Sequence, residues 1–391
     1  MHWRSKLIHP GAHAPGNFRS LTTPTYRGST VVFERQADVS DDWRQTEGGY
    51  TYGLYGTPTV LELGARIAEI EGAHHSFVVP GGQAAISLIY LAFCKTGAHA
   101  LVPFTAYGPN RELGTGLLRN LGITVEAYDP MIGAGIANLI RDNTALVWVE
   151  SPGSVTMEVQ DVPAIVAAAH ARKVPVALDN TYAAGVLFDA FAHGVDVSMQ
   201  ALTKYVGGHS DLLLGSVSVI DGPAYEAIGA AYKQLGMAVS PDDCSLALRG
   251  LKTLGVRLER LEKTALELAQ WLADQPPIST VLHPALPSCP GHEYWRRDFT
   301  GSSSIFSVIF QERFTALQVA AFADRLRLFK IGFSWGGVTS LVLVYPNLQR
   351  PGRSYGGRLV RLNVGLEEPS DLLADLAQAL SVMDAADSEP V

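Results

Sequence analysis

Two segments of the sequence carry a reactive side chain at or near the end of an apolar run. In VPVALDNTYAAG, Asp179 ends a run that is typical of a buried strand, and a carboxylate there needs a partner to keep its charge. A helix cap or a buried ion pair would also explain this residue. In SMQALTKYVGGHSD, Lys204 has an apolar setting, and a buried lysine can react with an aldehyde to form a Schiff base. Taken alone, Lys204 is more readily explained as a lysine that extends to the surface.

A third segment, VVPGGQAAI, suits an anion. The predicted strand ends at Val79, Gly81 and Gly82 let the backbone approach a ligand, and a helix begins whose N–H groups and dipole favour phosphate. Glycines occur in tight turns for structural reasons at least as often, so this segment alone does not define a site.

Together, these three groups match the needs of one cofactor. Pyridoxal phosphate requires a cup for its phosphate, an acid against its pyridinium nitrogen and a lysine for its aldehyde. Asp179 and Lys204 are 25 residues apart, which lets them approach a ring from different elements. Tyr107, in TAYGP, could stack on a flat ring, although a half-buried loop aromatic would look the same. The dinucleotide fingerprint, the P-loop and the G-x-S-x-G elbow are absent.

The elements that must position these groups alternate between helix and strand from Thr57 onward. Strands separated by helices pair in parallel, and runs that are apolar throughout, such as ALVWV, belong to a sheet covered on both faces. The predicted strands are 76–79, 99–102, 124–128, 145–150, 174–179 and 216–220, and the predicted helices are 57–72, 82–91, 110–121, 162–172 and 225–235.

The two ends of the chain follow other patterns. The first 57 residues are rich in Pro, Gly and charge, which predicts an extended arm that lies on a partner subunit. Near the C-terminus, a long helix at 250–274 precedes strand-like SIFSVIF, LVLVY and LVRLNV, which alternate with helices at 315–328 and 369–380. We therefore expect an arm at 1–57, a cofactor-binding α/β domain at 58–249 and a smaller α+β domain at 250–391.

The composition argues against several classes of protein. The 391 residues are 47% hydrophobic and 17% charged, which is typical of a folded chain. The net charge of -8 argues against a nucleic-acid partner. The three cysteines lack metal-binding spacing, so we expect no metal site and a reducing compartment. No apolar stretch could span a bilayer and the N-terminus lacks the apolar core of a signal peptide, so we expect a cytoplasmic protein that contacts no membrane.

From about Tyr50 to the C-terminus, the chain resembles the Cys/Met-metabolism family of fold-type I pyridoxal-phosphate enzymes. The segments that carry the resemblance are TAYGPNR, YDPMIGAGI, VWVESPGSVTMEVQDVPAIV, LDNTYAAGVLF, QALTKYVGGHSD, RGLKTLGVRL, HPALPS, GHEYWRRDFTGSSSIFS, SWGG and RLNVGLEE. The resemblance implies a large α/β domain with a mostly parallel seven-stranded sheet covered by helices, a smaller α+β C-terminal domain and an extended N-terminal arm. It also implies pyridoxal 5'-phosphate as the cofactor.

Carried over position by position, the resemblance implies roles for the matching residues. Lys204 would form the Schiff base, Tyr107 would stack on the ring and Asp179 would keep the pyridinium nitrogen protonated. The implied phosphate ligands are Gly82, Gln83 and Thr203, with Tyr52 reaching in from the neighbouring subunit. The implied residues around the substrate α-carboxylate are Arg361, which would bind it, and Ser334 and Trp335, which would line its pocket. Tyr232 matches a tyrosine near the active site.

The chain departs from the family pattern in the arm. The family element should read Tyr-x-Arg-Arg-Gly-Thr, but here Leu54 and Tyr55 stand in place of the two arginines. The first loss weakens the implied phosphate site, and the second removes a cation near the distal end of the substrate. A distal aspartate of the family is Glu112 here, with Arg111 beside it. We therefore expect Glu112 and Tyr55 to line the distal part of the substrate pocket.

The resemblance implies a carbon–sulfur β-lyase that cleaves cystathionine to homocysteine, pyruvate and ammonia in methionine biosynthesis. It also implies a homotetramer made of dimers that share active sites. The same chemistry on cystine, an S-alkylcysteine, its sulfoxide or another cysteine conjugate remains an alternative. A γ-lyase or γ-synthase is disfavoured by the close β-lyase match at 150–161 and 299–304. A non-catalytic regulator that binds the cofactor is disfavoured by the joint presence of Lys204, Asp179, Tyr107 and Arg361.

Overall fold

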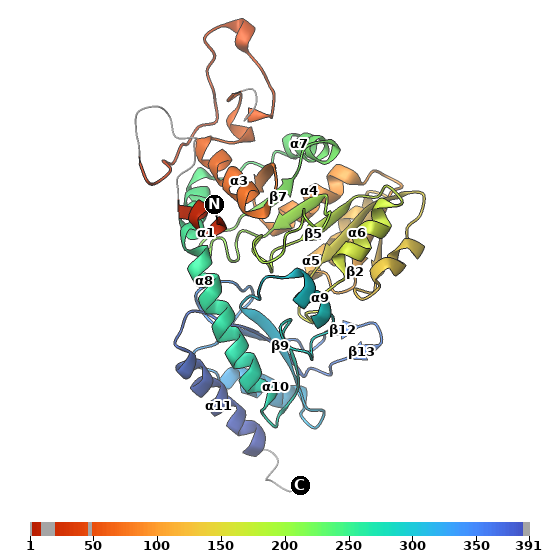
Figure 1. Ribbon diagram of the computed structural model, residues 1–391, viewed down its shortest axis with the longest axis vertical. Helices are drawn as coiled ribbons and strands as arrows, with labels where there is room; N and C mark the ends of the chain where they lie inside the picture. Colours follow the sequence, from red (N-terminus) through yellow and green to blue (C-terminus); the bar gives the residue numbers. More distant parts are fainter. Residues whose placement is uncertain (1, 9–19, 46–48, 386–391) are drawn as a thin grey trace.

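The computed structural model describes residues 2–8, 20–45 and 49–385. Two folded parts follow one another along the long axis, and one long helix, α8 (Pro241–Ala273), runs from the first into the second (Figure 1). Residues 20–45 extend from the first part with little regular structure. Of the arm predicted at 1–57, residues 1, 9–19 and 46–48 lie outside the described residues.

The first part is built on a seven-stranded sheet in the order β1-β7-β6-β5-β4-β2-β3. Strand β7 is antiparallel to both of its neighbours, and the other pairings are parallel. The prediction of a mostly parallel seven-stranded sheet is therefore confirmed. The strands are β1 (His75–Val79), β2 (His99–Pro103), β3 (Thr124–Tyr128), β4 (Thr144–Glu150), β5 (Val176–Asp179), β6 (Val197–Gln200) and β7 (Gly215–Val219).

The search for apolar runs does not predict strand β6. Its sequence, VSMQ, alternates apolar and polar residues, yet Ser198 and Gln200 are 0% and 1% exposed. The hydroxyl of Ser198 donates to Oε1 of the buried Glu71 at 2.7 Å. The polar face of β6 is thus buried against a hydrogen-bonding partner rather than exposed to water.

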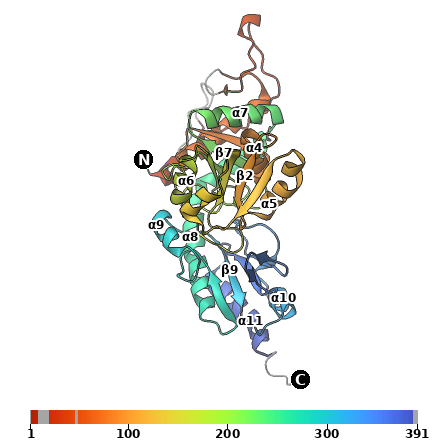
Figure 2. The ribbon, with the colours of Figure 1, turned by 90° about the vertical axis from the view of Figure 1, so that its right-hand side faces the viewer.

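Helices cover both faces of this sheet (Figure 2). Alternate residues of β4 enter different cores, since Leu146 and Trp148 pack with α4 and α7 while Val147 and Val149 pack with α6. The helices are α3 (Pro58–Glu71), α4 (Gly82–Phe93), α5 (Gly108–Leu113), α6 (Val162–His170) and α7 (Pro223–Leu235). The helix predicted at 110–121 begins earlier, as α5, and continues as a π-helical segment, Gly114–Leu118.

Helix α8 begins at Pro241, so the start predicted at Gly250 is wrong. The side chain of Ser240 caps the helix by accepting from the Asp242 N–H. Gly250 is instead a packing residue inside the helix, because a Cβ there would lie 2.1 Å from the carbonyl oxygen of Val206. The predicted domain boundary between residues 249 and 250 therefore falls within one continuous helix.

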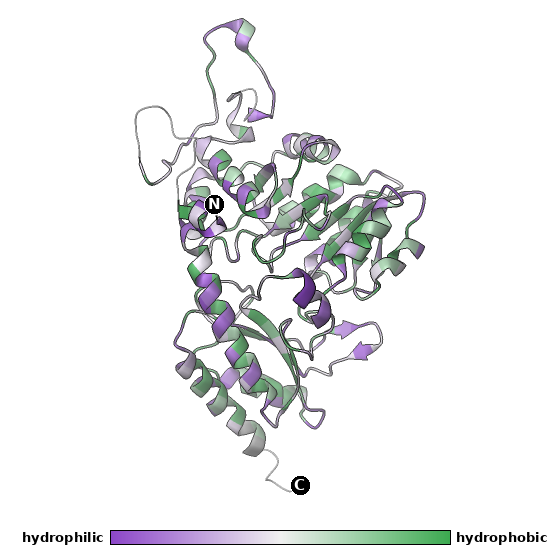
Figure 3. Cartoon of the chain, viewed as in Figure 1, coloured by the Kyte–Doolittle hydropathy of each residue, from purple (hydrophilic) through white to green (hydrophobic). Residues whose placement is uncertain are grey.

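The second part contains a five-stranded sheet in the order β10-β11-β14-β9-β8. The C-terminal half of α8 packs on it together with α10 and α11, which buries Leu268, Phe306, Phe322 and Leu376 completely. Figure 3 shows the alternation of hydrophobic and hydrophilic residues along α8 that makes this packing possible. The elements are β8 (Ile278–Leu282), α9 (His292–Asp298), β9 (Ile305–Phe310), α10 (Ala316–Arg325), β10 (Lys330–Ile331), β11 (Leu341–Val344), β14 (Leu359–Asn363) and α11 (Pro369–Ala385).

Two further strands and one further α-helix are short. Strands β12 (Gln349–Arg350) and β13 (Arg353–Ser354) form a separate antiparallel pair, and α1 (Trp3–Ile8) packs against α8. No helix in the described ranges is both long and apolar enough to cross a membrane.

The contact at Gly250 leads to a first prediction. Gly250→Ala should lower the free energy of unfolding by about 1–3 kcal/mol, because the added methyl group must push α8 away from the Val206 carbonyl. Chemical denaturation would measure the loss. Gly116→Ala is the control, because a Cβ there meets no atom within 4 Å. Equal effects of the two substitutions would contradict the proposed close contact.

Candidate active site

A cavity of about 360 Å³ lies between the carboxyl ends of the large sheet and the second part of the chain. This edge is where open α/β sheets bind their ligands. Loops and turns that follow the strands of the first part bring most of the lining, while β9, β14 and the loop before β11 contribute from the second part. The sequence-predicted residues that line it are Gly82, Gln83, Tyr107, Asp179, Thr203, Lys204, Trp335 and Arg361.

Lys204 lies in the loop after β6, with its amine inside the cavity. Nζ donates to the Ser334 hydroxyl at 2.6 Å and lies 5.3 Å from the centre of the Trp335 ring. Burial, with a smaller contribution from the nearby Arg361 charge, lowers the pKa of Lys204 to about 8. The uncharged fraction of the amine near neutral pH is therefore much larger than for an ordinary lysine, although the ammonium form still predominates, and the uncharged form can act as a nucleophile or base.

Helix α8 fixes the loop that carries Lys204. The buried guanidinium of Arg257 donates from Nη1 to the Tyr205 carbonyl at 2.7 Å and from Nη2 to the Gly250 carbonyl at 2.8 Å. Gly208 has a φ of +73°, and a Cβ there would collide with Arg257. The two glycines thus let the loop and the helix approach each other closely.

Asp179 ends β5 and reaches the cavity from the floor. Its Oδ1 accepts from the Thr181 N–H at 3.0 Å. Burial raises the pKa of Asp179, whereas these hydrogen bonds and the Lys204 charge act in the opposite direction. A cation placed against this carboxyl would favour its charged form, which fits a partner for a pyridinium nitrogen.

The glycine turn between β1 and α4 forms the predicted anion cradle. No side chain caps the first turn of α4, so its N–H groups remain available to an anion. A Cβ on Gly82 would lie 2.8 Å from the Ala201 Cβ, so only glycine fits without movement. Thr203 is less free than predicted, because its hydroxyl donates to the Leu214 carbonyl and accepts from the Leu214 N–H, both at 3.1 Å.

Arg361 projects from β14 and is 9% exposed. Its Nη2 donates to the Ser334 carbonyl at 3.1 Å, and its guanidinium carbon lies 5.5 Å from the Tyr345 ring centre. Ser334 therefore contacts Lys204 through its hydroxyl and Arg361 through its carbonyl. It does so with a φ of 78°, a left-handed conformation that is costly for a residue with a side chain and is common at functional sites.

Glu150 also lines the cavity, although the sequence analysis assigned it no role. It is the last residue of β4 and pairs in register with Asp179 on β5. Its Oε2 accepts from the Tyr107 backbone N–H at 2.7 Å. The available signal was its position at the end of a predicted strand next to the strand that ends in Asp179.

Four other predicted residues do not line this cavity within the same chain. Tyr55 is 6% exposed and its hydroxyl donates to Asp41 Oδ1 at 2.6 Å, in a separate cavity that also contains Tyr232. Tyr52 is 46% exposed, and Glu112 lies on the exposed side of α5. Tyr55 therefore does not line the cavity of its own chain, and its place in the distal pocket of a neighbouring subunit stays a prediction.

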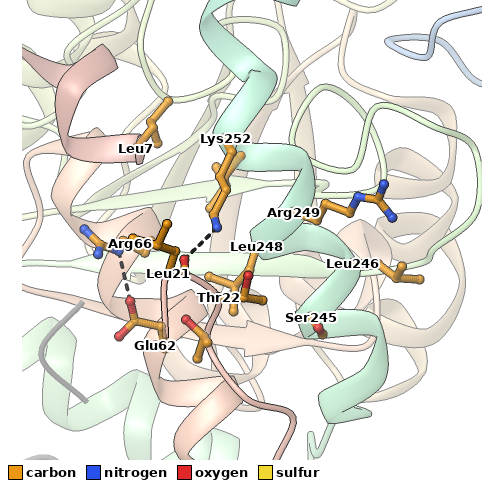
Figure 4. Close-up of a pocket in the computed structure, with 12 residues that line it drawn as sticks. Leu7, Leu21, Thr22, Glu62, Arg66, Ser245, Leu246, Leu248, Arg249 and Lys252 are labelled. Carbon is orange, nitrogen blue, oxygen red and sulfur yellow. Dashed lines mark hydrogen bonds and ion pairs between the residues drawn. The ribbon is translucent and has the colours of Figure 1, made fainter. Parts of the chain in front are cut away.

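A larger cavity of about 510 Å³ lies elsewhere, between the arm, α3 and α8 (Figure 4). Lys252 Nζ donates to the Leu21 carbonyl at 3.0 Å, and Arg66 Nε donates to Glu62 Oε1 at 3.0 Å. These two cations are engaged by acceptors of the chain itself. We assign no chemistry to this cavity.

The residues around Lys204 fit pyridoxal phosphate. They combine an amine of lowered pKa, a buried acid, an uncapped helix start behind a glycine that no larger residue could replace, and an aromatic ring on the cavity wall. Within the described part of the chain, no group of three or more His, Cys, Asp or Glu side chains could hold a metal ion.

Comparisons with known proteins agree with this chemistry. The chain is 42% identical to a putative cystathionine beta-lyase of Rhizobium johnstonii, over 97% of this chain and 96% of the relative. It is 39% identical to cystathionine beta-lyase MetC of Escherichia coli, over 95% and 96%. The crystal structure of metB from Corynebacterium glutamicum superposes with a TM-score of 0.90 at 29% identity and covers 98% of both chains.

The family model for Cys/Met metabolism PLP-dependent enzymes matches residues 4–381. This match covers nearly the whole chain, including every residue named above in the cavity. The protein therefore belongs to the Cys/Met metabolism family of enzymes that depend on pyridoxal phosphate.

Proposed function

We propose that the protein is a carbon–sulfur β-lyase that cleaves cystathionine to homocysteine, pyruvate and ammonia, as in methionine biosynthesis. The observation that carries the proposal is the cavity in which the amine of Lys204, with its pKa lowered to about 8, lies with Asp179 and Arg361. The relatives that bear the name cystathionine beta-lyase, at about 40% identity, support this choice of reaction.

In this proposal Lys204, Asp179 and Tyr107 hold the cofactor ring, and the turn at Gly82 and Gln83 holds its phosphate. When bound, pyridoxal phosphate supplies an aldehyde that bonds to an amine and a ring that withdraws electrons from the Cα of an attached amino acid. Thr203 would add a phosphate contact after exchanging its Leu214 partner. Tyr52 would contribute from a neighbouring subunit.

Arg361 binds the α-carboxylate of the substrate, since its fork can donate two parallel hydrogen bonds. Ser334 and Trp335 border this position and keep it close to the amine of Lys204. Lys204 removes the proton from Cα, which is possible because burial lowers the pKa of its amine to about 8. The same amine, once protonated, donates the proton to the sulfur that leaves Cβ.

A second candidate is a β-lyase with a broader range of cysteine S-conjugates, including cystine, S-alkylcysteines and their sulfoxides. Among the described residues that line the cavity, the cations are Lys204 and Arg361, and both have roles already. Arg111, beside Glu112, donates to the Phe104 carbonyl at 3.0 Å. No cation of this lining is therefore left for the second carboxylate of cystathionine.

The proposal also extends to assembly and location. We infer a homotetramer made of dimers that share active sites, because the exposed Tyr52 and the arm would then meet the cavity of a neighbour. A cytoplasmic location fits the three buried free cysteines.

The lowered pKa of Lys204 predicts how the apoprotein reacts with an acylating reagent. Burial disfavours the ammonium form, so the free amine should appear with a midpoint near pH 8 rather than about 10.4. Mass spectrometry of the Lys204 peptide after brief acetic anhydride treatment would follow it. Asp179→Asn should move the midpoint lower, because the Asp179 charge raises the pKa of Lys204. A midpoint near that of free lysine would contradict the assignment.

Arg361→Ala should lower kcat/KM about a hundredfold for every substrate, because the α-carboxylate is common to all of them. Steady-state kinetics on at least two substrates would measure it. Arg361→Lys should recover only part of the loss, since an ammonium cannot reproduce the planar fork. A loss confined to one leaving group would assign Arg361 to the distal end instead.

A panel of S-substituted cysteines tests the reaction and its specificity together. We expect pyruvate release from cystathionine, cystine and S-alkylcysteines, with kcat/KM values within roughly a hundredfold of each other. Tyr55→Arg should shift preference toward cystathionine by restoring a cation near the distal end of the substrate, whereas Leu54→Arg, at the position implied to reach the phosphate, should not. A wild-type enzyme that accepts cystathionine alone would refute the broader specificity, and absence of pyruvate from every compound would refute the β-lyase.

A further inference from the structure

Glu150 is a buried carboxyl that contacts the residue proposed to stack on the cofactor. It is 8% exposed, and its Oε2 accepts from the Tyr107 N–H at 2.7 Å. Tyr107 is the N-cap residue of α5, and its carbonyl accepts from the Asn110 N–H at 2.9 Å while its own N–H donates to Glu150. The hydrogen bond therefore links the end of β4 to the loop that carries the Tyr107 ring.

Glu150 also adjoins Asp179. The two residues are paired in register at the ends of parallel strands, which places their side chains on the same face about 4.8 Å apart at the backbone. Two buried carboxyls whose charges interact, as those of Glu150 and Asp179 do, do not both ionise easily. The site thus has two adjacent acids, and the pyridinium nitrogen of the cofactor needs only one of them as a partner.

Burial raises the pKa of both carboxyls, but that of Glu150 is raised further, so Glu150 takes up a proton more readily than Asp179. Burial and the Asp179 charge raise the pKa of Glu150 well above its usual range, while the Tyr107 N–H, Arg350 and Arg111 oppose this less strongly. Both arginines also donate hydrogen bonds to backbone carbonyls, Arg350 to that of Ser154 at 2.8 Å and Arg111 to that of Phe104 at 3.0 Å. The other titratable groups near Glu150 are the phenol of Tyr107 and the buried phenols of Tyr90 and Tyr128.

We propose that Glu150 is a positioning residue that anchors Tyr107 through its backbone amide and so sets the spacing between Tyr107 and Asp179. It acts as an uncharged carboxyl, which leaves Asp179 as the single negative charge at the floor of the cavity. The inference rests on the proposed function in one respect, namely that Tyr107 and Asp179 hold the cofactor.

Glu150→Gln and Glu150→Ala separate anchoring from charge. The amide oxygen of glutamine can still accept from the Tyr107 N–H, and glutamine is neutral like the proposed form of Glu150. Alanine leaves a buried N–H unpaired, which should weaken cofactor binding about tenfold. We expect Glu150→Gln to bind pyridoxal phosphate within about threefold of wild type, with an unchanged pH midpoint of the cofactor absorption band.

Glu158 supplies the matched control. It is also 8% exposed and lies near Arg350, but it does not line the cavity. Glu158→Ala and Glu158→Gln should alter the melting temperature of the apoprotein without changing cofactor affinity or the absorption midpoint. Fluorescence titration of the apoprotein would give the affinities, and kcat and KM would be measured on the loaded enzymes.

Several outcomes would overturn the inference. Equal cofactor affinity in Glu150→Ala and wild type would remove the anchoring role, and a shifted absorption midpoint in Glu150→Gln would show that Glu150 is charged. Equal losses in Glu150→Ala and Glu158→Ala would reduce the effect to general destabilisation. Asp179→Asn distinguishes the two levels of the argument: if it leaves cofactor affinity and spectrum unchanged, the cofactor assignment fails and the Glu150 inference fails with it.

Discussion

The structure depends on one buried amine, that of Lys204, whose pKa is lowered toward neutral pH. Lys204 must be desolvated to lose its proton near neutral pH, yet it must stay next to an acid and an arginine that act on the same substrate. Burial is the main cause of the lowered pKa, and hydrogen bonds to the backbone hold the loop that contains Lys204 in place. Arg257 on α8 binds the carbonyl of Tyr205, and Gly250 lets the helix approach the same loop. Helix α8 therefore holds the loop that contains Lys204 in place and also joins the two parts of the chain.

Ser334 gives the second part of the chain its share in the site. Its hydroxyl accepts a hydrogen bond from the Lys204 amine and its carbonyl accepts one from Arg361. Its left-handed backbone makes both contacts possible. Lys204 comes from the large sheet and Arg361 from the small one, so a movement between the two parts would separate the base from the carboxylate-binding group. The packing of α8 against α3 in the first part and on the small sheet in the second resists such a movement.

The acids at the floor show how a parallel sheet sets up chemistry. Neighbouring parallel strands end at the same edge, so Glu150 and Asp179 become neighbours by register alone. Because both carboxyls are buried, it is costly for both to be charged at once, so one is expected to be neutral while the other carries the charge. In the arm, Leu54 and Tyr55 are uncharged side chains. Tyr55 binds Asp41 of the same chain, which couples the arm to its own domain.

The sequence by itself determined the alternation of helices and strands, the parallel sheet and the placing of Asp179, Lys204 and the glycine turn at strand ends, because apolar periodicity and turn glycines are local signals. It did not reveal β6, whose polar face is buried, or the true start of α8, where Gly250 resembled a helix boundary. It also missed the roles of Glu150 and of the Leu214 partner of Thr203. Only the tertiary structure decided these, because the desolvation of a carboxyl, the clearance at a glycine and the partner of a hydroxyl all depend on residues distant in the sequence.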